Sequence, residues 1–280
     1  PKDSLYWLTA SAAIKGKGFD LYSAHTSSLL QATISDIKYG RNSVSEIQLN
    51  GRLKNHAYEL QLESGYPLAL LKASVSGILQ RNKAEMNLDA QVEYLNLYRL
   101  HLVDVPLSTA FRFEANASSN LNEILHLTGR LTQWELSGEE KTYYPQDTRF
   151  EAGTTHDSTY FEITAGDAFM KLNSDQGATK LSASLSLITE RLMNQYEQQE
   201  LDLTFLRPLL PNVHIQGFIG KQNPIQDLLE KKKIKFNEAS FSAATSPAQG
   251  LSVNMAMHKF QQDTLMVDTL RIESFEDTSG

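Results

Sequence analysis

The chain has 280 residues, of which 41% are hydrophobic and 21% charged, a balance typical of a folded protein with a substantial core. Its net charge is -7 and its only run of cations is 231–233, which argues against nucleic acid as a ligand, because such sites need clustered Lys and Arg to replace phosphate counterions. The absence of cysteine excludes disulfides, cysteine-based metal sites and thiol catalysis.

Membrane-spanning and secretory signals are missing from the chain as given. No apolar run approaches about 18 residues, and the first residues lack a charged segment followed by an apolar stretch and a cleavage site. We therefore expect the chain as given to be soluble, and a fragment of a longer protein fits the same pattern.

Alternation of apolar and polar residues predicts strands along most of the chain, since successive side chains of a strand point to opposite faces. The pattern favours antiparallel strands with one solvated face, because parallel strands buried on both faces are almost continuously apolar. About fifteen antiparallel strands are predicted in this way. Their apolar residues are Leu8, Ala10, Ala12, Ile14; Leu30, Ala32, Ile34; Ile47, Leu49, Leu53; Tyr58, Leu60, Leu62; Ala73, Val75, Gly77, Leu79; Met86, Leu88, Ala90, Val92, Tyr94; Leu107, Phe111, Phe113, Ala115; Leu127, Gly129, Leu131; Leu181, Ala183, Leu185; Val213, Ile215, Ile219; Leu251, Val253, Met255, Met257; Leu265 and Val267.

Two segments show a helical pattern instead. In 186–200, Ile188, Leu192 and Tyr196 recur at the spacing of an amphipathic helix. In 223–233, Asn223 is a plausible N-cap, followed by Pro224 at the first helical position and Gln226 at the third. The lysines 231–233 then fall in the last turn, where cations suit the helix dipole, and this interpretation is favoured over a membrane-surface patch.

The chain also repeats itself with a spacing of about 105 residues. The matching segments are LNLYRL (95–100) with LDLTFL (201–206), the strands that begin at Pro106 and Pro211, and the turns Asn120 to Glu123 and Asn223 to Gln226. A repeat built from one-sided strands suggests a structure that grows by adding strands at its end rather than one that closes.

Chemical motifs are scarce. The seven histidines are scattered singly without metal-ligand spacing, and Glu139 and Glu140 lie together in a loop, where such carboxylates usually face solvent. Gly16 and Gly18 form a GxG without a following helix, which indicates a strand-end turn rather than a phosphate loop. No hydrolase, P-loop or metalloprotease motif is present. We expect no enzymatic activity and no cofactor.

The order of elements resembles the TamB family, the translocation and assembly module proteins of Gram-negative envelopes related to the AsmA-like proteins. The similar features are the KGKGFD strand end, the NGRL strand with its polar hairpin, the long alternating pair, the LNLYRLHL link and the GRL strand after a short capped turn. The resemblance covers residues 10–136 well and the second copy more loosely, and 139–175 fits it least.

The resemblance implies a curved antiparallel sheet that forms an open apolar trough (a β-taco), with one or two short amphipathic helices. It also implies a periplasmic segment of a bridge-like lipid transfer protein, anchored in the inner membrane by an N-terminal helix outside this chain. The expected partners are phospholipid acyl chains and a BamA/TamA-like barrel protein of the outer-membrane assembly machinery, with no nucleic acid. Three segments of one continuous β structure are expected: 1–136 as the first strand repeat, 137–185 as a further β segment and 186–280 as the helix and second repeat.

The predicted lipid-contacting residues lie on the apolar sides of these strands, and no single one is expected to be essential. They are Leu49, Leu53, Leu60, Leu62, Val75, Leu79, Met86, Leu88, Val92, Phe111, Phe113, Leu127, Leu181, Leu185, Val213, Ile215, Val253 and Met255. A closed sandwich has the same alternation, so the sequence leaves open whether protein or lipid covers these faces. The helix at 186–200 either caps the trough or covers an edge strand. A chaperone-like module for outer-membrane barrel strands and a carbohydrate-binding or adhesive β-protein are the alternative functions.

Overall fold

The computed structural model describes residues 5–39, 42–197, 206–230 and 233–275. The chain divides into two compact units. Unit 1 comprises Pro1–Asn122 and Leu127–Asp147, and unit 2 comprises Glu123–His126 and Thr148–Gly280. The described residues form eighteen strands rather than about fifteen, and the paired strands run antiparallel, so the prediction of a mainly β, antiparallel fold with two helices is confirmed.

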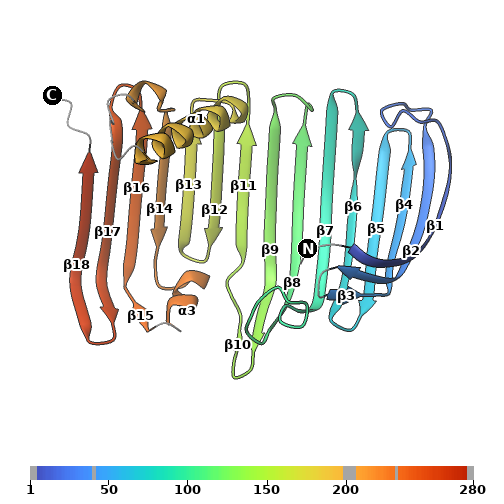
Figure 1. Ribbon diagram of the computed structural model, residues 1–280, viewed down its shortest axis with the longest axis horizontal. Helices are drawn as coiled ribbons and strands as arrows, with labels where there is room; N and C mark the ends of the chain where they lie inside the picture. Colours follow the sequence, from blue (N-terminus) through green and yellow to red (C-terminus); the bar gives the residue numbers. More distant parts are fainter. Residues whose placement is uncertain (1–4, 40–41, 198–205, 231–232, 276–280) are drawn as a thin grey trace. The chain divides into compact units, whose positions relative to one another are not determined.

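Unit 1 is built from strands alone within its described residues. Its elements are β1 (Leu5–Lys17), β2 (Ser27–Tyr39), β3 (Asn42–Val44), β4 (Ile47–Lys54), β5 (Ala57–Tyr66), β6 (Ala69–Gln80), β7 (Lys83–Asn96), β8 (Leu107–Ser119), most of β9 (Leu125–Gly138) and β10 (Thr142–Tyr143). Figure 1 shows β1 to β3 curling around one edge of this sheet. Among the described strands β1 pairs only with β2, so the sheet is curved but does not close into a barrel.

Unit 2 adds helices to the same kind of sheet. Its elements are β11 (Thr148–Thr154), β12 (Thr159–Ala165), β13 (Ala168–Ser174), α1 (Ala178–Glu197), the 3₁₀-helix η1 (Arg207–Leu209), β14 (Val213–Ile219), α3 (Pro224–Glu230), β15 (Ile234–Lys235), β16 (Glu238–Ser246), β17 (Gly250–Gln262) and β18 (Leu265–Phe275). Residues 148–174, where the resemblance fits least, therefore form three regular strands.

The prediction of a strand through Leu181, Ala183 and Leu185 is wrong, because these residues lie in α1. The predicted helix at 186–200 also begins too late, since α1 starts at Ala178, and 198–200 lie outside the described residues. Alternating Ser and Leu in this segment fits a strand, but Leu181 and Leu185 are also spaced four apart as on a helix. A tertiary hydrogen bond secures the helix start: the Ala178 N–H donates to Thr154 Oγ1 (2.8 Å).

The start of α3 follows the prediction closely. Asn223 accepts a hydrogen bond at Oδ1 from the Gln226 N–H (3.0 Å), which is the N-cap geometry expected from the sequence. Asn223 Nδ2 donates to Asp167 Oδ1 (2.7 Å), and Gln226 Nε2 donates to the Phe236 carbonyl (2.8 Å). Asn223 is fully buried, and together with Gln226 it ties the start of α3 to the β12–β13 turn and to Phe236, the residue directly after β15.

Of the lysines 231–233, which the sequence placed in the last turn of this helix, only Lys233 is described, and it lies outside the helix. The helix ends at Glu230, and 231–232 lie outside the described residues. Lys233 follows in a left-handed conformation (φ 56°), with its Nζ 3.9 Å from Asp263 Oδ1. The first copy of the repeat forms a turn without a helix, in which the Asn122 N–H donates to Asn120 Oδ1 (3.0 Å).

In both units an aromatic side chain lies over a glycine on the neighbouring strand. In unit 1, Tyr58 lies opposite Gly77 and donates its hydroxyl to the Glu85 carbonyl (3.0 Å). In unit 2, Phe241 lies opposite Gly217, where a Cβ would come within 2.2 Å of its ring. These glycines provide space for aromatic rings on the sheet.

Candidate apolar binding face

The strand register of unit 1 collects the predicted apolar residues on one face of its sheet. Directly opposed residues on β1, β2 and β4 to β8 form three rows that cross seven strands, and strands in a sheet lie about 4.8 Å apart. The rows are Ala10, Ile34, Ile47, Ser64, Leu71, Val92, Phe111; Ala12, Ala32, Leu49, Leu62, Ala73, Ala90, Phe113; and Ile14, Leu30, Gly51, Leu60, Val75, Leu88, Ala115. We call this surface the apolar face of unit 1. Leu53, Met86 and Leu79 extend it toward the strand ends.

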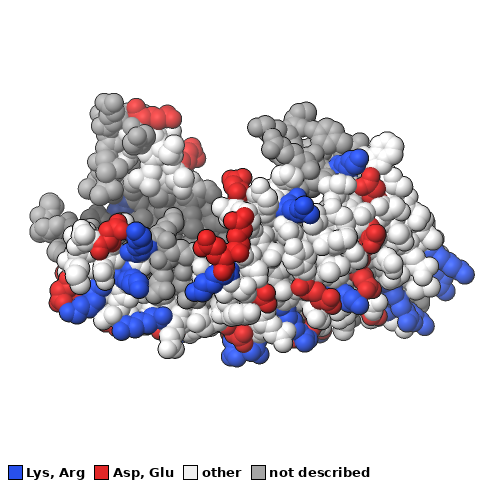
Figure 2. Space-filling view, turned by 90° about the horizontal axis from the view of Figure 1, so that it is seen from below, with Lys and Arg blue, Asp and Glu red and all other residues white. Residues whose placement is uncertain are grey.

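The opposite face of the same strands is polar and carries ion pairs. Lys72 Nζ lies 2.9 Å from Glu63 Oε1, and Arg112 Nη2 lies 2.6 Å from Asp89 Oδ2. Figure 2 shows acidic and basic side chains lying beside one another on the surface it presents. The two faces of the sheet therefore differ sharply in polarity, and the polar face is the one suited to solvent.

Partial burial distinguishes the apolar face from a closed core. Among the described residues, the most buried apolar side chains, Ala115 and Leu206, keep 4% of their surface exposed, whereas Leu60 keeps 39% and Ile14 keeps 75%. The chain exposes 18455 Å², while two separate compact proteins of half its mass would together expose roughly 14,600 Å². The residues of this face are covered mainly by their own neighbours in the sheet.

Unit 2 repeats the arrangement on β11 to β14 and β16 to β18. Its clearest row is Phe150, Ile163, Met170, Gly217, Phe241, Met255, Ile272, and the next is Ala152, Phe161, Leu172, Ile215, Ala243, Val253, Ser274. We call this surface the apolar face of unit 2. Val213 lies on the same face one row further along.

Of the remaining predicted contact residues, one lies on β9 and two lie in α1. Leu127 is half-buried on β9. Leu181 is buried at the start of α1, while Leu185, one helical turn later, is 49% exposed. Because Thr154 belongs to the same side of β11 as Phe150 and Ala152, its hydrogen bond to Ala178 places the start of α1 at the rim of the apolar face of unit 2.

Sequence reasoning missed much of the apolar face of unit 2. Phe150, Ile163 and Met170 lie in 139–175, where the resemblance fits least and no individual strand was assigned, and Phe241 was assigned to no strand. The short alternations TRFEAGT and AFMKLNS were the available signal, since each places large apolar residues on one side.

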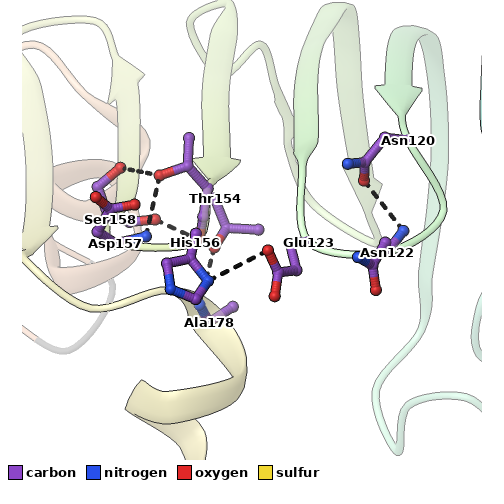
Figure 3. Close-up of polar contacts among 9 residues, drawn as sticks. Asn120, Asn122, Glu123, Thr154, His156, Asp157, Ser158 and Ala178 are labelled. Atoms are coloured by element: carbon purple, nitrogen blue, oxygen red, sulfur yellow. Dashed lines mark hydrogen bonds and ion pairs between the residues drawn. The ribbon is translucent and has the colours of Figure 1, made fainter.

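Titratable side chains of the described residues meet in pairs and in small groups. His156 Nδ1 lies 3.2 Å from Glu123 Oε2 (Figure 3), and His126 Nε2 lies 3.2 Å from Glu151 Oε1, which also accepts a hydrogen bond from Tyr160 (3.0 Å). Burial and this contact with Glu151 raise the pKa of Tyr160 above its ordinary value. Among the described residues, no group of three or more His, Asp or Glu is placed to hold a metal ion.

One hollow of about 720 Å³ lies where α3, β15, β17 and β18 meet. Lys221, Lys235 and Lys259 line it together with Phe236 and Phe260. Lys259 pairs with Asp268 in the same hollow, so part of its positive charge is already compensated.

No protein-family model, curated protein or solved structure matches this chain. In the part of the chain that the structure describes, no helix combines the length and hydrophobicity needed to cross a membrane.

Proposed function

We propose that this chain is a non-enzymatic periplasmic segment of a TamB-like bridge protein that carries phospholipids between membranes, contributes to outer-membrane protein assembly, or does both. The observation that carries this proposal is the apolar face of unit 1, whose rows cross seven strands while residues such as Ile14 and Leu60 stay exposed. Lipid acyl chains lie on this face, and their headgroups remain at its solvated rim.

The chemistry of the apolar faces suits a ligand that slides. Each CH₂ group removed from water contributes about 0.8 kcal/mol, so an acyl chain is held by apolar area and needs no specific pocket. The rows consist of Ala, Val, Leu, Ile and Phe with few polar interruptions, so neighbouring positions offer an acyl chain similar contacts. Such a surface holds a chain firmly without fixing it at one position.

Lipid bound to the purified protein is the direct test. We expect solvent extraction and mass spectrometry to recover phospholipid after purification without added lipid. Protein that carries no lipid and whose apolar faces are packed dry against other protein would contradict the proposal.

A sharper test places a charge on the apolar face. Val75 lies directly opposite both Leu60 and Leu88, so Val75→Asp puts a carboxylate in the middle of a row, where burial beneath an acyl chain is costly. With a photocrosslinking residue at position 60 or 88, we expect crosslinking to lipid to fall about tenfold or more, which corresponds to about 1.4 kcal/mol. Ser76→Asp, on the opposite face of the same strand, is the matched control and should leave it unchanged. Equal crosslinking in both variants would show that Val75 does not line a lipid groove.

The edge of β18 favours a second candidate, the chaperone-like module. Among the described strands β18 pairs only with β17, so its other edge offers backbone groups to an incoming strand. Crosslinks from alternate β18 positions to outer-membrane barrel proteins, with none to lipid from either apolar face, would favour this function over lipid transport.

A further inference from the structure

The loop between β1 and β2, residues 18–26, exposes apolar side chains. Phe19 is 103% exposed, Leu21 54% and Tyr22 41%. Single exposed apolar residues are common on protein surfaces, but three of them in four consecutive positions form a patch that favours binding. We call residues 18–26 the β1–β2 tip.

Asp20 holds the β1–β2 tip in a defined conformation. Its carboxylate accepts a hydrogen bond from the Tyr22 N–H (3.0 Å) and an ion pair from Arg81 (3.2 Å). Its backbone oxygen accepts bonds from the Ser23 N–H (3.0 Å) and the Thr26 hydroxyl (2.6 Å). The Tyr22 N–H and then Arg81 lower the pKa of Asp20, which keeps this carboxylate charged. The apolar side chains thus project from an ordered loop.

Cations surround the base of the tip. Lys17 and Lys54 flank Ser27 on the two strands that pair with β2, which places their backbones about 10 Å apart. Lys15 and Arg52 repeat this arrangement around Leu29, one row further from the tip. None of these four cations takes part in an ion pair among the described residues, although the whole chain carries a net charge of -7. We call these four residues the basic collar.

We propose that the β1–β2 tip and its basic collar dock onto the surface of an anionic lipid bilayer. The three apolar side chains enter the boundary between headgroups and acyl chains, and the collar contacts lipid phosphates. A bilayer fits this surface better than a protein partner, because stable protein interfaces bury about 800 Å² on each side and the tip is a small projection. The inference stands apart from the proposed lipid-carrying function, since it uses no residue of the apolar rows.

Flotation of the whole chain with vesicles tests the proposal. We expect binding to phosphatidylcholine vesicles that contain phosphatidylglycerol, with affinity at least about tenfold lower for phosphatidylcholine alone, because each collar residue contributes about 1 kcal/mol only on an anionic surface. Added salt should weaken binding, since it screens exposed charges. Equal binding to both kinds of vesicle, or to neither, would overturn the proposal, and so would binding to acidic proteins alone.

Variants of exposed apolar residues distinguish vesicle binding by the β1–β2 tip from nonspecific hydrophobic binding. Phe19→Ser with Leu21→Ser should reduce vesicle binding about tenfold or more, because two apolar insertions are lost. Leu102→Ser with Val105→Ser is the matched control, since these residues are 61% and 60% exposed in the loop between β7 and β8. Equal losses for the two double variants would contradict a role for the tip.

Charge reversal tests the collar in the same way. Lys17→Glu with Lys54→Glu should abolish the preference for anionic vesicles, whereas Lys38→Glu with Lys180→Glu makes the same change in net charge elsewhere and should keep it. Val75→Asp, which tests lipid carriage, should leave vesicle binding unchanged. The docking inference and the proposed function can therefore fail separately.

Discussion

Units 1 and 2 present the same kind of apolar face but are held together differently. In unit 1 the described residues form strands alone, and stability comes from cross-strand neighbours on one sheet. Unit 2 adds α1, α3 and the fully buried Asn223, which links α3 to the β12–β13 turn through Asp167. The shared feature is the apolar face, so this face, rather than the helices, is what relates the two halves of the chain.

Matching residues in the two copies of the sequence repeat have the same structural role in one case and different roles in another. Leu100 and Leu206 match in the repeat, and both are buried, at 7% and 4% exposure. Asn120 and Asn223 also match, but only Asn223 caps a helix. The residue three positions later explains part of this difference: the amide of Gln226 donates to the Phe236 carbonyl, which an ionised Glu123 carboxylate cannot do. Glu123 pairs with His156 instead.

Removing the buried cap should have the largest effect and should act on one unit only. Asn223→Ala leaves the Gln226 N–H without its acceptor and Asp167 Oδ1 without its donor, and we expect it to lower the free energy of unfolding of unit 2 by roughly 3 kcal/mol. Both tryptophans, Trp7 and Trp134, lie in unit 1, whereas the described helices lie in unit 2. The midpoint of denaturation measured by far-ultraviolet circular dichroism should therefore move to a lower denaturant concentration. The midpoint measured by tryptophan fluorescence should not change.

The matched control for this substitution is Asn120→Ala in the other copy of the repeat. Its side chain accepts a bond in a surface turn, so we expect a loss below about 1 kcal/mol. If Asn223→Ala moves both transitions equally, the two units unfold as one and the contrast between them does not hold.

Sequence patterns predicted the apolar faces that the two units share better than the helix α1 and the buried Asn223, which are found in unit 2 alone. Alternation along 47–92 is long and regular, so Leu49, Leu60, Val75 and Leu88 were correctly assigned to one side of their strands. Serines between the leucines of 181–187 permit both a strand and a helix, and Thr154, which is distant in sequence, accepts the hydrogen bond that secures the helix start. No local pattern reports the burial of Asn223 or the partnership of Asp167 with it, because both arise from tertiary packing.

The two leucines at the start of α1 should respond differently to the same substitution. Leu181 is 7% exposed, and Leu181→Ala should destabilise unit 2 by about 2 kcal/mol through the loss of buried side-chain area. Leu185 is 49% exposed, and Leu185→Ala should change stability by less than about 0.5 kcal/mol. Circular dichroism melts measure both effects. A lower recovery of bound lipid from the Leu185 variant at unchanged stability would extend the lipid surface from the sheet onto α1, whereas unchanged recovery would restrict it to the strands.

Lowering the pH should reduce the stability of unit 2 by protonating Asp167. We expect this effect to be smaller than those of Asn223→Ala and Leu181→Ala. Burial pushes the pKa of Asp167 upward, but hydrogen bonds from Asn223, Gln222 and Lys221 outweigh it and hold the pKa below its ordinary value. A lowered pKa in the folded state means that the carboxylate contributes its full stability above the unfolded pKa of about 3.9 and loses it as the pH falls through the folded pKa. The stability difference between the wild type and Asp167→Asn, measured by circular dichroism, should therefore shrink as the pH is lowered from about 5 to 3. A constant difference for Asp167→Asn would assign its effect to lost hydrogen-bond geometry rather than to charge.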